Sequence, residues 1–319
     1  MVSTCVLAFV SCLVSAGALP QAQSRTVVVS APKRSYSEVP VSVLVTPPPG
    51  RTGAIVLEGK RSIPCQVERQ DSRLAVTWLV RGLRKGEKRT YKIEFVSQPA
   101  AGVRHTVRRI GNDLELLLDN QLFVRYDVTT GPNKPYFHPV YGPDQRLIVR
   151  GFPVAPRPGE TNDHPHHRGL WFTHGNVNGE DFWSEQPGVT QHAGYSNISS
   201  GPVYCGFEAE TNWINRAGET IARDSRRFRA YVLNNQRILD VEITIRPTGK
   251  PLVFGDTKEG TLGMRLADSM RLRGGDGHIA NSQGVRDKDT WGKRADWVDY
   301  YGSVDGQTVG VAILDHPKS

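Results

Sequence analysis

The chain has 319 residues and a formal net charge of +8, because 40 Lys and Arg outnumber 32 Asp and Glu. The basic residues are scattered among the acidic ones, whereas nucleic-acid-binding proteins usually gather them on one face. This composition argues against a nucleic-acid partner. It indicates a mildly basic surface, to which a polyanionic sugar could also bind.

The first 18 residues form an uncharged apolar stretch that ends in Ala16-Gly17-Ala18, the small-residue pattern of a secretory cleavage site. They predict a signal peptide over 1–18 and an exported protein, periplasmic or extracellular. No later stretch is apolar enough to cross a bilayer, so we expect no membrane span in the mature chain. Cys65 and Cys205 would remain after cleavage, either as a disulfide or as two buried free thiols.

Residues 25–99 show short strands broken by turns. Apolar runs cover 41–45 and 74–80, and Tyr91, Ile93 and Phe95 alternate with two charged residues. This alternation has the period of a half-buried strand. We therefore predict a small β-sandwich-like domain over 25–99, with a linker at 98–102.

Residues 103–319 are also rich in strand patterns. Val241, Ile243 and Ile245 alternate with polar residues, and Asn234-Asn235 separates this run from the apolar run at 228–233. Asparagine tolerates positive φ, so this pair predicts a hairpin turn. No long stretch has the 3.6-residue period of an amphipathic helix. The sequence predicts an all-β protein whose second domain, 103–319, is a larger β-sandwich.

The segment 162–185 is the most unusual part of the chain. It contains four histidines, one arginine, two tryptophans and several carboxylates. Histidine exchanges protons near neutral pH and ligates metals, while tryptophan offers a flat face for stacking. This concentration predicts a functional site, for which the residues leave three interpretations open.

A divalent metal site is the first interpretation. On an extended chain His164 and His166 project to the same side, where Asp163, His138 or His174 could complete a ligand shell. The residues would then serve a metal-dependent oxidoreductase.

Acid–base chemistry on a polar organic ligand is the second interpretation. Two histidines, one of them oriented by a carboxylate, can pass protons to and from a hydroxyl or carbonyl group. Arg168 would bind a carboxylate or ring oxygens, and Trp171 or Trp183 would stack on a sugar face. In the third interpretation the segment has a structural role alone: the histidines form hydrogen bonds within a loop, and the aromatic residues fill the core.

Two downstream segments add charged and aromatic groups. Lys258, Glu259 and Arg265 lie in a glycine-flanked segment, which is either a solvent-exposed turn or the source of a general base, Glu259. Trp291, with Lys293 and Arg294, forms a cluster of the kind that lines both sugar-binding clefts and protein interfaces.

Several separate motifs occur in order along the chain: Tyr136-Phe137-His138-Pro139-Val140-Tyr141, Asp163-His164-Pro165-His166-His167-Arg168-Gly169-Leu170-Trp171-Phe172, Asp181-Phe182-Trp183, Lys258-Glu259-Gly260, Trp291-Gly292-Lys293-Arg294-Ala295, Trp297-Val298-Asp299-Tyr300 and Asp315-His316-Pro317. Together they resemble the PmoA-like family of exported bacterial proteins, over nearly the whole mature chain. The resemblance implies a β-sandwich similar in shape to the sugar mutarotases, with the histidine-rich loop at its cleft. Members of that family continue beyond the Asp-His-Pro element, so a fragment is one interpretation of the end at Ser319.

We therefore expect an exported carbohydrate-active protein, an enzyme of hydrolase, lyase or isomerase type, with a non-catalytic sugar-binding module as a further alternative. Its partner would be a carbohydrate or a sugar-derived small molecule. The expected catalytic residues are His164, His166, His167, His174 and Glu259. The expected substrate-binding residues are His138, Arg168, Trp171, Trp183, Lys258, Arg265, Trp291, Lys293 and Arg294.

Overall fold

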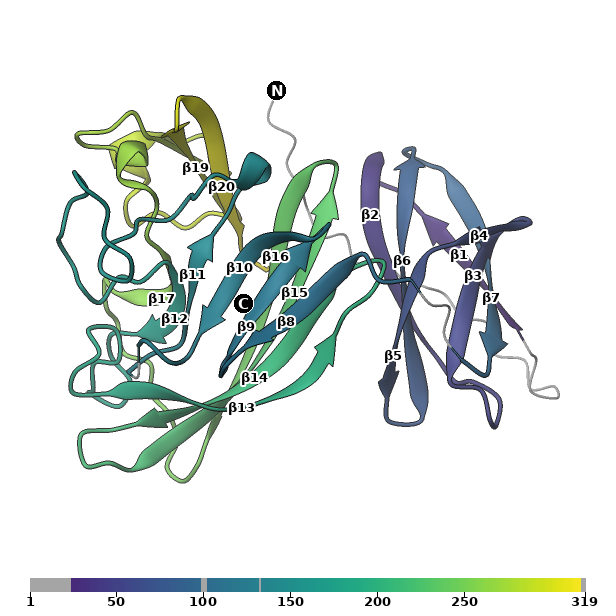
Figure 1. Ribbon diagram of the computed structural model, residues 1–319, viewed down its shortest axis with the longest axis horizontal. Coiled ribbons are helices and arrows are strands. Elements are labelled where there is room, and N and C mark those ends of the chain that lie inside the picture. Colours follow the sequence, from purple (N-terminus) through teal and green to yellow (C-terminus); the bar gives the residue numbers. More distant parts are fainter. Residues whose placement is uncertain (1–23, 99–101, 132, 317–319) are drawn as a thin grey trace.

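The computed structural model describes residues 24–98, 102–131 and 133–316, and the predicted signal peptide lies outside these ranges. The described residues form the expected all-β structure, with antiparallel sheets and three short 3-10 turns (Figure 1). Among them, no helix is both long and apolar enough to cross a lipid bilayer.

The first seven strands build a two-sheet unit. One sheet has the order β1-β7-β3-β4 and the other the order β2-β6-β5. Tyr91, Ile93 and Phe95 are buried between the sheets with Trp78, which confirms the alternation read from the sequence. The strands are β1 (Ser24–Ser30), β2 (Tyr36–Val45), β3 (Gly53–Glu58), β4 (Arg61–Ile63), β5 (Cys65–Gln70), β6 (Arg73–Leu83) and β7 (Lys88–Val96).

A larger sandwich follows. A six-stranded sheet of order β17-β12-β11-β10-β9-β8 faces a four-stranded sheet of order β13-β14-β15-β16. Phe137 from the first sheet meets Phe207 and Phe228 from the second in the shared core. The strands are β8 (His105–Ile110), β9 (Asp113–Leu118), β10 (Gln121–Asp127), β11 (Tyr136–Val140), β12 (Leu170–His174), β13 (Val189–Ser199), β14 (Cys205–Ile214), β15 (Thr220–Leu233), β16 (Gln236–Pro247) and β17 (Gly260–Met264).

The hairpin predicted at Asn234-Asn235 is confirmed. Both asparagines have positive φ, 48° and 64°, and Leu233 pairs with Gln236 across the turn. The strand before the turn is longer than the apolar run suggested, because it begins at Thr220 and carries alternating polar residues.

The chain ends in a three-stranded sheet of order β18-β19-β20, drawn in yellow-green and yellow in Figure 1. Its strands are β18 (His278–Asn281), β19 (Trp297–Val304) and β20 (Gln307–Leu314). The 3-10 turns are η1 (Pro143–Gln145), η2 (Asp268–Met270) and η3 (Asp287–Thr290).

Specific polar contacts join the first unit to the larger sandwich. The Gln66 side chain donates to the Ser199 hydroxyl at 2.8 Å and accepts the backbone N–H of Tyr204 at 3.1 Å. Arg229 forms an ion pair with Glu68 at 2.9 Å. The two cysteines that remain after the predicted cleavage are free and buried, so the disulfide alternative is not formed in this structure.

A buried ion pair in the larger sandwich gives a stability prediction. Asp224 accepts two hydrogen bonds from Arg226, at 2.9 and 2.8 Å, and one from the Trp213 indole at 2.7 Å. Asp224→Ala would leave the Arg226 guanidinium buried without its partner. We expect it to lower the free energy of unfolding by about 3–5 kcal/mol in chemical denaturation.

Lys92→Ala is the matched control, because it breaks an exposed pair with Glu94 and should cost less than about 1 kcal/mol. Equal effects of the two substitutions would contradict a structural role for the buried pair.

Candidate functional site

The histidine-rich segment forms a tight turn just before β12. His164 has a φ of +50°, and its carbonyl accepts the backbone N–H of His167 at 2.9 Å. Gly169, with a φ of +54°, closes the turn where any Cβ would overlap the carbonyl oxygen of Phe137 on β11. A residue larger than glycine would therefore push the turn away from the sheet.

Three of the four imidazoles meet in this turn. The rings of His164 and His167 are stacked with centroids 4.8 Å apart, and His166 lies edge-on to His167 at 4.4 Å. Burial lowers the pKa of His167 to about 3, helped by the neighbouring charges of His166 and Arg265. Burial also lowers the pKa of His166, followed by the effects of Lys134 and His164. Both rings are thus neutral at pH 7.

His164 is oriented by a carboxylate. Its Nδ1 lies 3.0 Å from Oδ2 of Asp163, while Oδ1 of Asp163 contacts Arg265 and accepts a 2.7 Å hydrogen bond from Arg150. Burial works against the charge of Asp163, yet the bonds from Arg265 and His164 outweigh it and hold its pKa well below the usual range. A neutral His164 that donates Nδ1–H to Asp163 keeps a lone pair on Nε2, and its side chain is 53 % exposed.

A buried lysine, Lys134, bonds the main chain of the turn. Lys134 is 0 % exposed, and its Nζ donates to the backbone carbonyls of His166 and Trp183 and pairs with Glu185 at 3.1 Å. The ammonium also lies 5.0 Å from the centroid of the Trp171 ring. Burial lowers the pKa of Lys134 to about 8. Lys134 was not predicted from the sequence, because it lies between two prolines in a segment that resembles an exposed turn.

The two tryptophans do not form the expected sugar-stacking face. Trp171 and Trp183 are only 4 % and 6 % exposed, and their rings pack together at 5.0 Å. They support His167 instead: Trp171 stacks on its ring, and the Trp183 indole N–H donates to Nε2 at 3.2 Å. Because Nε2 of His167 is occupied in this way, we assign His167 a positioning role and correct its expected catalytic role.

Arg168 is also engaged within the protein. It forms an ion pair with Glu185 at 3.0 Å and lies over the ring of Tyr136 at 5.7 Å. Glu185 is buried and is shared by Arg168 and Lys134, so its charge balances two cations. Arg168 thus has an internal partner, and its binding of a substrate carboxylate stays a prediction. Glu185 was missed, because nothing local in the sequence links it to Lys134.

Two other predicted histidines, His174 and His138, make no ring contact with the three imidazoles of the turn within the described ranges. Nε2 of His174 lies 3.0 Å from the carbonyl of Gly255, and its ring packs against Phe254 at 5.3 Å. His138 is buried on β11, and this burial lowers its pKa. The strand alternation turns His174 away from the face on which Trp171 lies. His138 lies closer to the turn, because a Cβ at Gly169 would come within 3.3 Å of the Cβ of His138.

The downstream segments behave differently from each other. Arg265 reaches Asp163, and the charge of Glu259 contributes to the pKa of His166, so the 255–265 segment approaches the turn. Lys258 is exposed and lies 3.8 Å from Glu259. Trp291 is 77 % exposed in the stretch that also carries the exposed Lys293 and Arg294. Within the described ranges, no ring contact, hydrogen bond or ion pair links these last three side chains to the turn.

The proposed metal ligands do not converge. In the part of the chain that the structure describes, no group of three or more His, Cys, Asp or Glu side chains is arranged to hold a metal ion. Asp163 and His164 bond each other, and His166 turns its ring against His167.

The buried lysine gives a prediction for the rigidity of the site. Lys134→Met would remove the donor to the carbonyls of His166 and Trp183 and leave those polar groups buried. We expect it to lower the free energy of unfolding by about 3 kcal/mol, measured by denaturant titration. Lys258→Met is the control, since this lysine is exposed and its loss should change stability by less than about 0.5 kcal/mol. A Lys134 variant as stable as the control would remove the lysine from this role.

The neutral imidazoles make stability depend on pH. The folded-state pKa of His167, about 3, lies below the value of about 6.5 expected when unfolded, so the unfolded chain binds more protons between these values. The stabilisation is complete above pH 6.5 and is lost as pH falls toward 3. In thermal melts from pH 7 to 4, we expect His167→Gln to reduce the fall in Tm relative to the wild type. An unchanged slope would show that His167 is not the titrating group.

Residues 113–319 match the model of a family of unknown function, DUF6807. The matched region includes β9 to β20 and the whole histidine-rich turn. No curated protein matches the chain. Since the family model covers well over half of the sequence, the chain belongs to the DUF6807 family.

Proposed function

We propose that this protein is an exported carbohydrate-active enzyme in which His164, oriented by Asp163, transfers protons to and from a sugar or a sugar derivative. One observation carries the proposal: a half-exposed imidazole paired with a carboxylate that two arginines keep ionised. The resemblance to exported PmoA-like proteins is consistent with this function and remains a prediction.

The pair favours His164 as the general base. When Nε2 takes a proton from the substrate, the ring becomes an imidazolium, and the negative charge of Asp163 stabilises it. Arg150 and Arg265 keep that charge in place. His166, which is neutral at pH 7, lies beside His164 with ring centroids 5.8 Å apart and can act as a second proton carrier.

The same arginines favour one reaction type over another. Glycoside hydrolysis usually needs two carboxyl groups, one of which is protonated and acts as an acid. Asp163 is held ionised and cannot take that role at neutral pH. Proton removal from carbon or oxygen by an imidazole needs no second carboxyl group, so a lyase or isomerase fits this site better than a hydrolase.

The charged groups around the turn suggest the substrate class. Arg265 is partly exposed beside Asp163, and Lys258 and Glu259 lie on the segment that approaches the turn. Cations near a base stabilise negative charge that develops when a proton leaves. An oxidised sugar, whose carboxylate acidifies the neighbouring C–H, would benefit most from this arrangement.

The test follows proton transfer directly. The wild-type protein would be incubated in D2O with a panel of uronic acids, aldonic acids and neutral oligosaccharides, and deuterium uptake and products followed by NMR. We expect His164→Gln and Asp163→Asn to lower the turnover of an active compound by about 10²-fold or more.

His278→Gln provides a matched control, because His278, on β18, is also half-exposed and its Nδ1 lies 3.4 Å from Oδ1 of Asp287 in η3. It should leave turnover unchanged. Full activity of the His164 variant would disprove its role as the base. Saturable sugar binding by the wild type, without deuterium uptake or product, would instead identify a non-catalytic binding module.

A further inference from the structure

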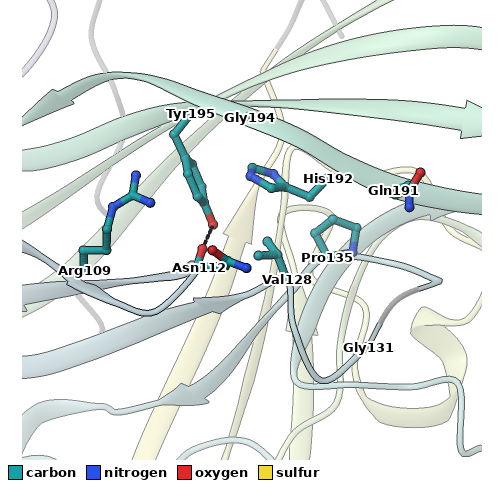
Figure 2. A pocket seen from close by; sticks show the side chains of 9 residues that line it. All are labelled: Arg109, Asn112, Val128, Gly131, Pro135, Gln191, His192, Gly194 and Tyr195. Atoms are coloured by element: carbon teal, nitrogen blue, oxygen red, sulfur yellow. Dashed lines mark hydrogen bonds between the residues drawn. The ribbon is translucent and has the colours of Figure 1, made fainter.

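A pocket in the larger sandwich is lined by none of the three histidines of the turn. It has a volume of about 410 Å³, which is within the range typical of small-molecule sites. Figure 2 shows β13 on one side of it and the β8–β9 turn with the segment after β10 on the other. It is lined by Arg109, Asn112, Val128, Gly131, Pro135, Gln191, His192, Gly194 and Tyr195. None of the residues predicted from the sequence lines it.

The pocket contains a cation without an acidic partner. Arg109, on β8, has its guanidinium 5.5 Å from the centroid of the Tyr195 ring. In the ranges that the structure describes, Arg109 makes no ion pair, whereas its neighbour Arg108 is paired with Glu115 at 2.6 Å. The planar guanidinium presents parallel N–H groups that match a carboxylate.

Tyr195 contacts two other residues that line the pocket, Asn112 and His192. Its hydroxyl donates to the backbone carbonyl of Asn112 at 2.9 Å, which ties β13 to the β8–β9 turn (Figure 2). The ring of His192 lies 4.1 Å from the Tyr195 ring. Nδ1 of His192 is buried and has no hydrogen-bond partner among the described residues. Burial lowers the pKa of His192, so its ring is neutral at pH 7 and can both donate and accept.

Nearby carboxylates do not compete for Arg109. Oδ1 of Asp113 accepts the backbone N–H of Val128 at 3.0 Å and the Thr129 hydroxyl at 2.9 Å. Asp127 accepts the backbone N–H groups of Thr129 and Thr130, at 3.0 and 2.8 Å. Both acids are buried and are bonded within the loop that follows β10. The accessible charge of the pocket is thus positive.

We propose that this pocket binds a compact, polar small molecule with one carboxylate, of the uronic acid class. The carboxylate pairs with Arg109, and the hydroxyl groups of the ligand bond to His192 and Gln191. Binding here is independent of the chemistry proposed at His164. One loop connects the two sites. Gly131 and Pro135 line the pocket, and Lys134, which lies between them in the sequence, donates to the backbone carbonyl of His166 in the histidine turn.

The test measures binding of D-glucuronate to the whole protein by calorimetry and ligand-observed NMR, with D-glucose as the neutral counterpart. We expect glucuronate to bind at least tenfold more tightly than glucose. Arg109→Gln should weaken glucuronate binding at least tenfold and leave glucose unaffected, because it removes only the charged contact. His192→Phe keeps the ring and should weaken both ligands.

Arg246→Gln is the matched control. Arg246 is an exposed arginine on β16, at the opposite edge of the sheet that begins with β13, and its loss should change neither affinity. Thermal melts would show that all variants are folded.

Absence of saturable glucuronate binding in the millimolar range would overturn the proposal, as would equal affinity of the wild type and the Arg109 variant. If His164→Gln abolishes glucuronate binding while Arg109→Gln does not, the ligand occupies the histidine turn. That outcome would disprove the pocket proposal and leave the proposed function intact. The reverse result would support the pocket alone.

Discussion

The candidate site depends on one buried ammonium group. Lys134 has no exposed surface, yet it bonds the main chain of both halves of the histidine-rich segment and pairs with the buried Glu185. Burying an ammonium group is costly unless its N–H groups have hydrogen-bond or ion-pair partners. The groups that bond Lys134 must therefore keep their positions. The turn that carries His164, His166 and His167 is therefore fixed by a residue that cannot itself reach a substrate.

The sequence predicted the fold well, because its strongest signals are local. Alternation in β7 and β16 and the Asn234-Asn235 turn each depend on residues a few positions apart, and the structure confirms them. The site was predicted only in part. The cluster of three imidazoles comes from one short segment, so its composition could reveal it. Lys134, Arg150 and Glu185 act across long sequence separations, and no local pattern indicates such pairings.

Three residues expected to bind substrate have partners within the protein instead. Trp171, Trp183 and Arg168 have the side chains that sugar-binding sites use, but here the two indoles are buried against each other and Arg168 is paired with Glu185. Once buried, the indoles support His167, and Arg168 balances Glu185. Residue type alone cannot distinguish a binding surface from the layer beneath it, since both favour aromatic and cationic groups.

The electrostatics of the turn explain why two of its three imidazoles, His166 and His167, are neutral at pH 7. The ring centroids of the three histidines lie within 6 Å of one another. Protonation of His166 and His167 is opposed by burial and by neighbouring charges, among them Lys134. Asp163, in contrast, is surrounded by donors and stays ionised. Among the three histidines of the turn, His164 is the one that combines an ionised partner, Asp163, with an exposed ring. Proton transfer at this turn is therefore expected to centre on His164.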